Sequence, residues 1–174
     1  MELNNYNILL RSLEFRDIEM VRLWRNSSFV REYMEFRDNI TIELQRKWYE
    51  ALGNNNYYFI IYHNNYPIGL TYIKNTRDDI GYFGIFIADE ESLNTLPMIS
   101  YKTMISMLDF AFYELKLKLV EATILYTNPR AMRFNESVGF KLIKENSTEI
   151  KQYYLLKEDN YAIKSKKIKK ILLR

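Results

Sequence analysis

The sequence contains no cysteine and only one histidine, His63, among 174 residues. Disulfide bonds, thiolate metal sites and a cysteine nucleophile are therefore excluded, and a single histidine cannot build a histidine metal cluster. Long apolar runs are also missing. No stretch approaches the roughly 20 residues that a bilayer-spanning helix requires, and residues 1–7 lack the apolar core of a signal peptide. We expect a cytoplasmic protein that uses neither a metal nor a membrane.

Basic charge is concentrated at one end of the chain. The net charge is +3, yet residues 161–174 carry six basic side chains and no acidic one, so the rest of the chain has a net charge of −3. A mildly acidic body argues against a nucleic-acid-binding surface. We interpret residues 1–160 as one domain, long enough to bury a core, and residues 161–174 as a solvated basic tail. The helical spacing of Ile168, Ile171 and Leu172 leaves docking of this tail open.

Hydrophobic periodicity predicts helices and strands in mixed order. The expected strands are residues 8–13, 57–62, 68–73, 80–88, 119–126, 140–144 and 153–156. The expected helices begin near Asp17, Thr41, Ser100 and Asn128, and the third of them is the longest, at residues 100–117. Asn64 and Asn65 are expected to form the tight turn of a hairpin. This order favours an α+β fold over a doubly wound sheet.

A motif late in the chain supplies the functional signal. The run from Asn128 to Phe140 reads Asn-Pro-Arg-Ala-Met-Arg-Phe-Asn-Glu-Ser-Val-Gly-Phe and follows a strand, a long helix and a second strand. It resembles the late motif of the GNAT superfamily of acetyl-coenzyme A N-acetyltransferases. The matching positions are Asn128, Ala131, Met132, Arg133, Glu136, Gly139 and Phe140. The early run Leu-Trp-Arg-Asn at residues 23–26 resembles the branch that acetylates ribosomal-protein N-termini and nucleotide-linked amino sugars.

The resemblance implies a central mixed, mostly antiparallel sheet, flanked by helices and splayed at its middle strands near Phe86 and Tyr126. Acetyl-coenzyme A, as the co-substrate, would lie in that opening. Its pyrophosphate would sit at a helix N-terminus, where N–H groups and the helix dipole favour an anion. The residues implied for binding it are Phe86, Ile87, Ser100, Tyr101, Lys102, Asn128 and Arg133.

Two features depart from the family pattern. The stretch from Thr95 to Ser100 contains no glycine, and Pro97 has no N–H, so fewer backbone donors can approach a pyrophosphate. We therefore expect coenzyme A to bind weakly, with a Kd on the order of tens to hundreds of micromolar. In addition, Asn135 stands where the family often has a tyrosine that protonates the departing thiolate, and an amide cannot act as that acid.

Several side chains have both a functional and a structural interpretation. Tyr82 and Tyr126 are candidate replacement acids, and Asn135 is a third catalytic candidate, although each can equally serve packing. Arg25 and Asn26 end the first predicted helix and are candidates either for binding the acceptor or for capping. Asn128 can contact the cofactor, but an asparagine before a proline-led helix is also a typical N-cap.

The chemistry implied needs no nucleophilic side chain, because a neutral amine attacks an acyl thioester directly. The site must position both reactants, stabilise the carbonyl oxygen and relay protons. We expect an N-acetyltransferase acting on the primary amine of a small molecule, such as an amino group on a nucleotide-linked sugar. A protein N-terminus is the alternative acceptor, and a non-catalytic GNAT-like binding domain is the alternative class. A closed aromatic pocket would suit a sugar, and an open groove a peptide. A homodimer is left open.

Overall fold

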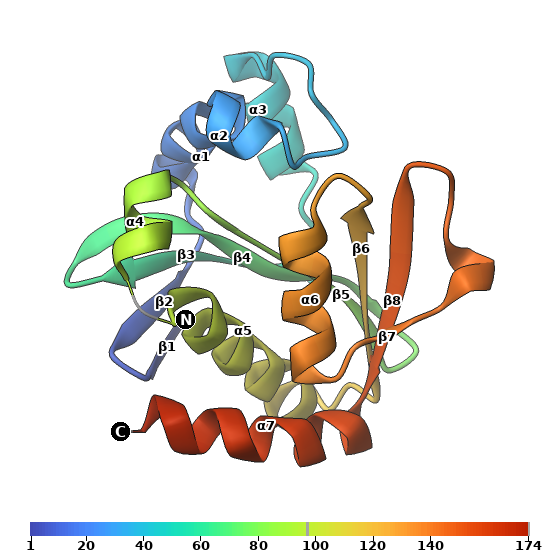
Figure 1. The fold of residues 1–174 in the computed structure, drawn as a ribbon. Helices are drawn as coiled ribbons and strands as arrows, with labels where there is room; N and C mark the ends of the chain where they lie inside the picture. Colours follow the sequence, from blue (N-terminus) through green and yellow to red (C-terminus); the bar gives the residue numbers. More distant parts are fainter. Residues whose placement is uncertain (97, 174) are drawn as a thin grey trace.

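The protein is built on an open eight-stranded sheet with helices on both faces (Figure 1). The computed structural model describes residues 1–96 and 98–173. The strand order is β1-β2-β3-β4-β5-β6-β8-β7, in which β5 and β6 run parallel and all other neighbours run antiparallel. The mixed, mostly antiparallel sheet predicted from the sequence is therefore confirmed.

The element bounds follow the predicted ones closely. The strands are β1 Glu2–Asn5, β2 Ile8–Ser12, β3 Tyr57–His63, β4 Tyr66–Arg77, β5 Ile80–Ile87, β6 Leu119–Leu125, β7 Lys141–Leu142 and β8 Lys151–Lys157. The helices are α1 Ile18–Asn26, α2 Ser28–Arg31, α3 Ile42–Glu50, α4 Glu90–Thr95, α5 Ile99–Asp109, α6 Pro129–Val138 and α7 Glu158–Leu172. Asn64 and Asn65 have φ of 49° and 66° and make the hairpin turn between β3 and β4, as predicted.

Alternating side chains of the central strands divide the core into two parts. Phe59 and Ile61 of β3 belong to the larger cluster, which α5 covers, whereas Ile60 between them belongs to a smaller cluster with Val21 of α1. Successive side chains of a strand point to opposite faces, so each face of the sheet has its own apolar layer. The functional cleft described below is lined from both faces of the sheet, by α1 and α2 on one side and by α5 and α6 on the other.

Two short elements were not predicted from the sequence. The first, β1, is largely polar and pairs with β2 at the edge of the sheet. The second, α4, occupies the stretch interpreted above as an acidic loop. Asp89 caps this helix, because its side chain accepts the Ser92 N–H at 2.7 Å. The same acidic residues that indicate a loop therefore start a helix here.

The long helix predicted at residues 100–117 is present but changes geometry along its length. After α5 the chain continues as a π-helical turn over Phe110–Glu114, closed by the Leu115 N–H bonding to the Phe110 carbonyl at 2.9 Å. The turn ends at Lys116, whose φ is 57°. This wider turn brings the chain directly into β6.

The two central strands separate shortly after they pair. Only Ile80, Gly81 and Tyr82 of β5 are in register with β6, opposite residues 119–121. Residues 83–87 and 122–125 continue as strands without pairing to one another. The prediction that the middle strands diverge near Phe86 is therefore confirmed. A wedge opens between β5 and β6, and one edge of β5 is left without a strand neighbour.

Residues 161–173 do not form the solvated tail expected from their charge. They lie in and just after α7, where Tyr161 and Ser165 are buried and Ile168 and Leu172 pack against the core. The Tyr161 hydroxyl donates to the Asp109 carboxylate at 2.7 Å, and burial together with this carboxylate raises the pKa of Tyr161. The apolar side chains recur at helical steps, so one face of the helix docks. Lys169 joins this face through an ion pair with Asp109 at 2.6 Å, whereas Lys164, Lys166, Lys167 and Lys170 are exposed. The prediction of a solvated tail counted the charges of this segment and gave too little weight to the apolar side chains between them.

Candidate functional site

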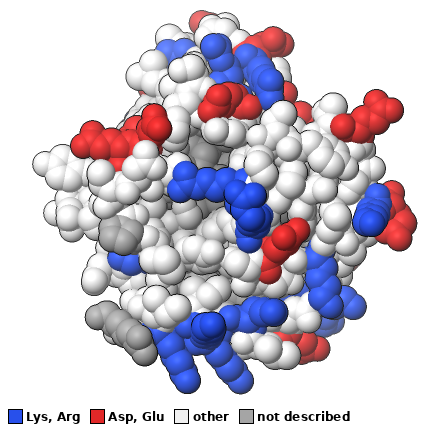
Figure 2. All heavy atoms as spheres, in the orientation of Figure 1, with Lys and Arg blue, Asp and Glu red and all other residues white. Residues whose placement is uncertain are grey.

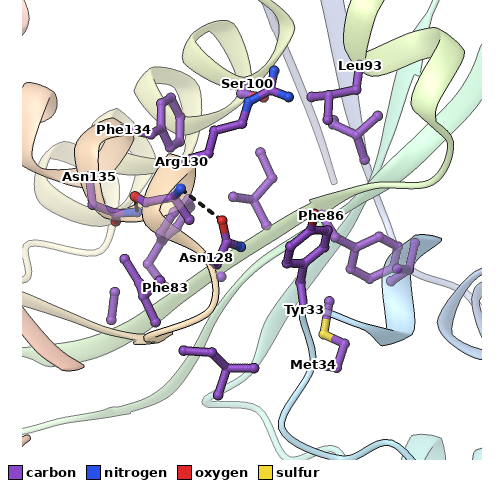
Figure 3. A pocket seen from close by; sticks show the side chains of 18 of the residues that line it. Tyr33, Met34, Phe83, Phe86, Leu93, Ser100, Asn128, Arg130, Phe134 and Asn135 are labelled. Carbon is purple, nitrogen blue, oxygen red and sulfur yellow. Dashed lines mark hydrogen bonds between the residues drawn. The ribbon is translucent and has the colours of Figure 1, made fainter. Parts of the chain in front are cut away.

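A cleft of about 830 Å³ lies where β5 and β6 part. Its walls come from α1, α2, β4, β5, β6, α4, α5 and α6, so it brings together segments from the whole length of the chain (Figure 3). Of the residues predicted from the sequence to form a site, most line it: Arg25, Tyr82, Phe86, Ile87, Ser100, Tyr101, Asn128, Arg133 and Asn135. Asn26, Lys102 and Tyr126 are not among the lining residues.

The start of α5 forms one end of the cleft. Met98 precedes this helix with φ 62° and ψ 13°, a left-handed conformation that usually favours glycine and costs other residues roughly 1–2 kcal/mol. Met98 thus takes a positive φ without glycine, while Pro97 lies outside the described residues. The first N–H groups of a helix lack partners within it. Those of Ile99 and Lys102 bond to Leu96 and Met98, and that of Ser100 has no acceptor within the described chain.

The start of α6 forms the facing wall. The Asn128 side-chain oxygen accepts the Ala131 N–H at 3.0 Å (Figure 3), Pro129 occupies the first turn, and Gly139 ends the helix at φ 114°. Asn128 is therefore an N-cap, one of the two roles predicted for it. It also lines the cleft, so its amide nitrogen can still reach a ligand.

Basic side chains border this part of the cleft. Arg130 and Arg133 of α6 both line it, and the Arg130 side chain points toward Ser100 at the start of α5 (Figure 3). Figure 2 shows basic side chains over α6 at the rim of a hollow. Sequence reasoning selected Arg133 from the motif and missed Arg130. The sequence feature that could have indicated Arg130 is its position in the first turn of α6, directly after Pro129.

The remaining predicted cofactor residues are held by packing. Phe86 packs edge-on against Trp24 of α1 at 6.3 Å between ring centroids, and Ile87 is buried. The Tyr101 ring packs against Phe134, and its hydroxyl lies 2.9 Å from the Ser137 hydroxyl. These contacts join β5 to α1 and α5 to α6, and so they fix the two sides of the wedge.

The three catalytic candidates differ in position. The Tyr82 hydroxyl bonds to the Thr123 hydroxyl and accepts the Thr123 N–H at 3.2 Å, so it joins β5 to β6 at the point where the strands part. Asn135 is buried and donates to the Ala131 carbonyl at 2.8 Å, and its Oδ1 has no partner among the described residues. Tyr126 is 48% exposed at the end of β6, outside the cleft lining.

The two residues predicted to bind the acceptor also differ in position. Asn26 bonds with both its amide atoms to the backbone of Ile40, each at 2.9 Å, and so fixes the connection to α3. Arg25 instead faces the cleft and is half-buried, and its buried Nε has no partner among the described residues. Burial lowers the pKa of Arg25. Of these two adjacent residues at the end of α1, Asn26 therefore has a structural role and Arg25 belongs to the cleft.

Sequence reasoning missed a row of aromatic rings beside Arg25. Tyr72 of β4 lies nearly parallel to Tyr82 of β5 at 6.5 Å, and Tyr58 of β3 adjoins Tyr72 at 4.9 Å. The Tyr72 ring crosses over Gly84, where an added Cβ would lie 2.2 Å from the ring. Gly84 thus leaves the space that the Tyr72 ring occupies on the cleft wall.

Gly84→Ala is accordingly expected to lower the free energy of unfolding by about 1–3 kcal/mol, because Tyr72 must leave its position. Chemical denaturation measures this difference. Gly53→Ala is the matched control. Its Cβ would meet the Asn55 side chain at 3.1 Å and the Asn56 side chain at 3.9 Å, both of them in a loop, so the change should be small. Equal stability of the two variants would contradict the packing described for Tyr72.

A family model described as an acetyltransferase (GNAT) domain matches residues 7–141. This match spans well over half of the chain. The chain belongs to the GNAT acetyltransferase family. No curated protein sequence matches it significantly.

Solved GNAT structures share the fold along almost the whole chain. FdhC, a nucleotide-linked sugar GNAT, has a TM-score of 0.81 at 20% identity over 99% of this chain and 98% of its own. Spermidine N-acetyltransferase from Vibrio cholerae, solved with CoA and spermine, has a TM-score of 0.79 at 18% identity, over 91% of this chain and 99% of its own. Aminoglycoside acetyltransferase AAC(6')-Ib, solved with coenzyme A, has a TM-score of 0.75 at 17% identity, over 90% of this chain and 98% of its own. At these identities the likeness establishes the fold.

The described residues of this GNAT protein contain neither a metal-ligand group nor a membrane-spanning helix. No three histidine, cysteine, aspartate or glutamate side chains in them are grouped as metal ligands. None of the described helices combines the length and the apolarity needed to cross a bilayer. The cleft between β5 and β6 therefore remains the site to be explained.

Proposed function

We propose that this GNAT protein transfers an acetyl group from acetyl-coenzyme A to the primary amine of a small molecule. The observation that carries the proposal is the wedge between β5 and β6 beside the N-terminus of α5. Family membership supports the type of reaction. The spermidine and aminoglycoside enzymes with this fold were both solved with coenzyme A, which supports the choice of co-substrate.

The residues present fit coenzyme A. Beyond Tyr82 the edge of β5 that faces β6 has no strand neighbour, so its backbone groups can bond to the amides of a pantetheine arm. The left-handed Met98 and the N–H of Ser100 provide the anion-binding end of α5. Arg130 and Arg133 add positive charge across from it. When bound, acetyl-coenzyme A would supply an acetyl group activated toward a neutral amine.

Within the cleft, the protein orients the reactants and excludes water. Asn135 occupies the position at which the family often has its tyrosine acid. It lines the cleft, and its buried Oδ1 has no partner among the described residues. We assign it an orienting role, because an amide does not release a proton. Tyr82 and Thr123 together place two hydroxyl groups where β5 and β6 separate, and we assign the proton relay to this pair.

The walls on the α1 and α2 side favour a small acceptor. Aromatic side chains line this region: Phe29, Tyr33, Phe36, Tyr72 and Tyr82. Such a surface suits the faces of a sugar or another compact amine. The nucleotide-linked sugar GNAT that shares the fold over the whole chain supports an amino sugar as the first compound to test. A protein N-terminus is the alternative acceptor, and the assay below includes a peptide to test it.

The experiment is a two-step assay on the full chain. Calorimetry should show coenzyme A binding with a Kd on the order of tens to hundreds of micromolar. Release of free thiol should then follow when acetyl-coenzyme A is mixed with a suitable amine. The panel contains a nucleotide-linked amino sugar, spermidine, an aminoglycoside and a peptide N-terminus. Turnover of the peptide alone would replace the small-molecule proposal. No binding at millimolar coenzyme A would favour a non-catalytic domain.

Asn135 provides a second test within the cleft. Asn135→Leu removes a buried amide whose oxygen has no partner among the described residues, so we expect the free energy of unfolding to stay within about 1 kcal/mol of wild type. If the amide orients a reactant, kcat/KM should nevertheless fall by roughly tenfold or more. Denaturation and steady-state kinetics on the same preparation separate the two effects. Unchanged kcat/KM would show that Asn135 only packs.

A further inference from the structure

Two cations on the acceptor side of the cleft have no acidic partner. Arg25 and Lys74 both line the cleft, and neither forms an ion pair or a side-chain hydrogen bond with any residue that the structure describes. By contrast, Lys151 on the same wall pairs with Glu35 at 2.7 Å. The other carboxylate in the lining is Glu90 of α4.

The surroundings of Arg25 make its isolation unusual. Its Nε is buried without a partner among the described residues, and a buried charge is costly unless it is paired and hydrogen-bonded. Trp24, packed on Phe86, and Asn26, bonded to Ile40, hold the end of α1 on both sides of it. These contacts fix the backbone from which the Arg25 side chain enters the cleft.

Lys74 completes the arrangement from the sheet. Its ammonium lies 5.2 Å from the centroid of the Tyr72 ring and 5.0 Å from that of Tyr82. Burial is the main cause that lowers the pKa of Lys74; the charges of Arg25 and Lys151 lower it further, and the charge of Glu35 raises it. The two cations thus share one pocket beside tyrosine rings, and the Glu35 carboxylate near them is already paired with Lys151.

We propose that Arg25 and Lys74 bind an anionic group, phosphate or carboxylate, carried by the amine acceptor. This inference rests on the proposed function and narrows its substrate class. An anion would bring the missing charge and acceptors to Arg25. The same field disfavours polycationic amines. It also lowers the pKa of a nearby acceptor ammonium, which raises the fraction of neutral amine that can react.

Binding of small anions tests the pocket without any turnover. In the calorimetric titration, uridine diphosphate is the ligand that carries phosphate, succinate is the ligand that carries carboxylate, and uridine is the uncharged control. Saturating coenzyme A is present, because free phosphate groups could otherwise occupy the N-terminus of α5. We expect one of the two anions to bind and uridine to bind at least tenfold more weakly. Binding of neither anion, or displacement of the anion by coenzyme A, would overturn the proposal.

Substitutions then locate the anion. Arg25→Gln and Lys74→Met should each raise the Kd of the bound anion by about 10- to 100-fold, whereas Arg25→Lys should recover part of the loss. The matched control is Lys157→Met, an exposed lysine at the end of β8 that is absent from the cleft lining. The Kd of coenzyme A should stay within about twofold in all of them. An anion Kd that is unchanged in Lys74→Met would contradict the assignment even if Arg25→Gln fails to fold.

Acceptor selectivity gives an independent readout. Wild-type kcat/KM should be at least tenfold higher for an amine that carries phosphate or carboxylate than for spermidine or an aminoglycoside, and Lys74→Met should reduce this ratio mainly through KM. Equal or better use of the polycations would overturn the anionic acceptor. If no amine reacts but anion binding still depends on Arg25 and Lys74, the proposed acetyl transfer fails while the anion site stands.

Discussion

Replacing Tyr161 by alanine is expected to lower the Tm by about 6–20 °C. The side chain is fully buried, stacks on Phe112 at 5.2 Å and bonds to Asp109. Removing a large aromatic side chain from a core costs roughly 3–5 kcal/mol, and a domain of this size loses about 2–4 °C per kcal/mol. Thermal unfolding followed by circular dichroism measures the shift.

Lys166→Ala is the matched control on the same helix, because Lys166 is exposed. Its Tm should change by less than about 2 °C. Tyr161→Phe should fall between the two, since it keeps the ring and loses only the hydroxyl, which bonds to Asp109 and to the Ile105 carbonyl. A Tm near wild type for Tyr161→Ala would mean that α7 is the solvated tail its charge suggested.

Removing both Arg130 and Arg133 is expected to weaken coenzyme A binding by about 10- to 100-fold. Both side chains line the cleft, and that of Arg130 points toward Ser100 at the start of α5, where we place the pyrophosphate. Charged hydrogen bonds to phosphate carry much of such affinity, although solvent screens exposed arginines. The double alanine variant should also show a weaker dependence of Kd on salt, because fewer charges attract the ligand. Calorimetry at two salt concentrations measures both effects.

Lys102→Ala is the control that distinguishes the sequence from the structure. The family resemblance implied this lysine as a coenzyme A ligand, but the structure leaves it out of the cleft lining. Its loss should change the Kd by less than about twofold. A large effect of Lys102→Ala together with a small effect of the double variant would show that the pyrophosphate lies elsewhere along α5.

Features decided by neighbours in sequence were predictable. Asn128, Pro129 and Gly139 fix where α6 begins and ends, because capping and positive φ depend on residues within one turn. The Asn64–Asn65 turn follows from the same local chemistry. The motif around α6 also indicated the family, which the match over residues 7–141 shows.

The choice between neighbouring side chains was not predictable. Arg25 and Asn26 follow one another on α1, yet one faces the cleft and the other bonds to Ile40. Arg130 and Lys102 are both basic residues near the start of a helix, and only Arg130 lines the cleft. A sequence pattern gives the residue type and the spacing, whereas the helix orientation selects the side chain that reaches the site.

The sequence by itself determined the elements, their caps and the family, because these depend on contacts within a few residues. Only the tertiary structure decided that Met98 takes a left-handed turn without glycine, that α7 docks through Tyr161, and that Tyr72 lies across Gly84 beside Arg25 and Lys74. Each of these depends on residues far apart in the chain. Packing against distant partners can compensate for a strained backbone or an unpaired charge, and such packing cannot be predicted from local sequence propensity.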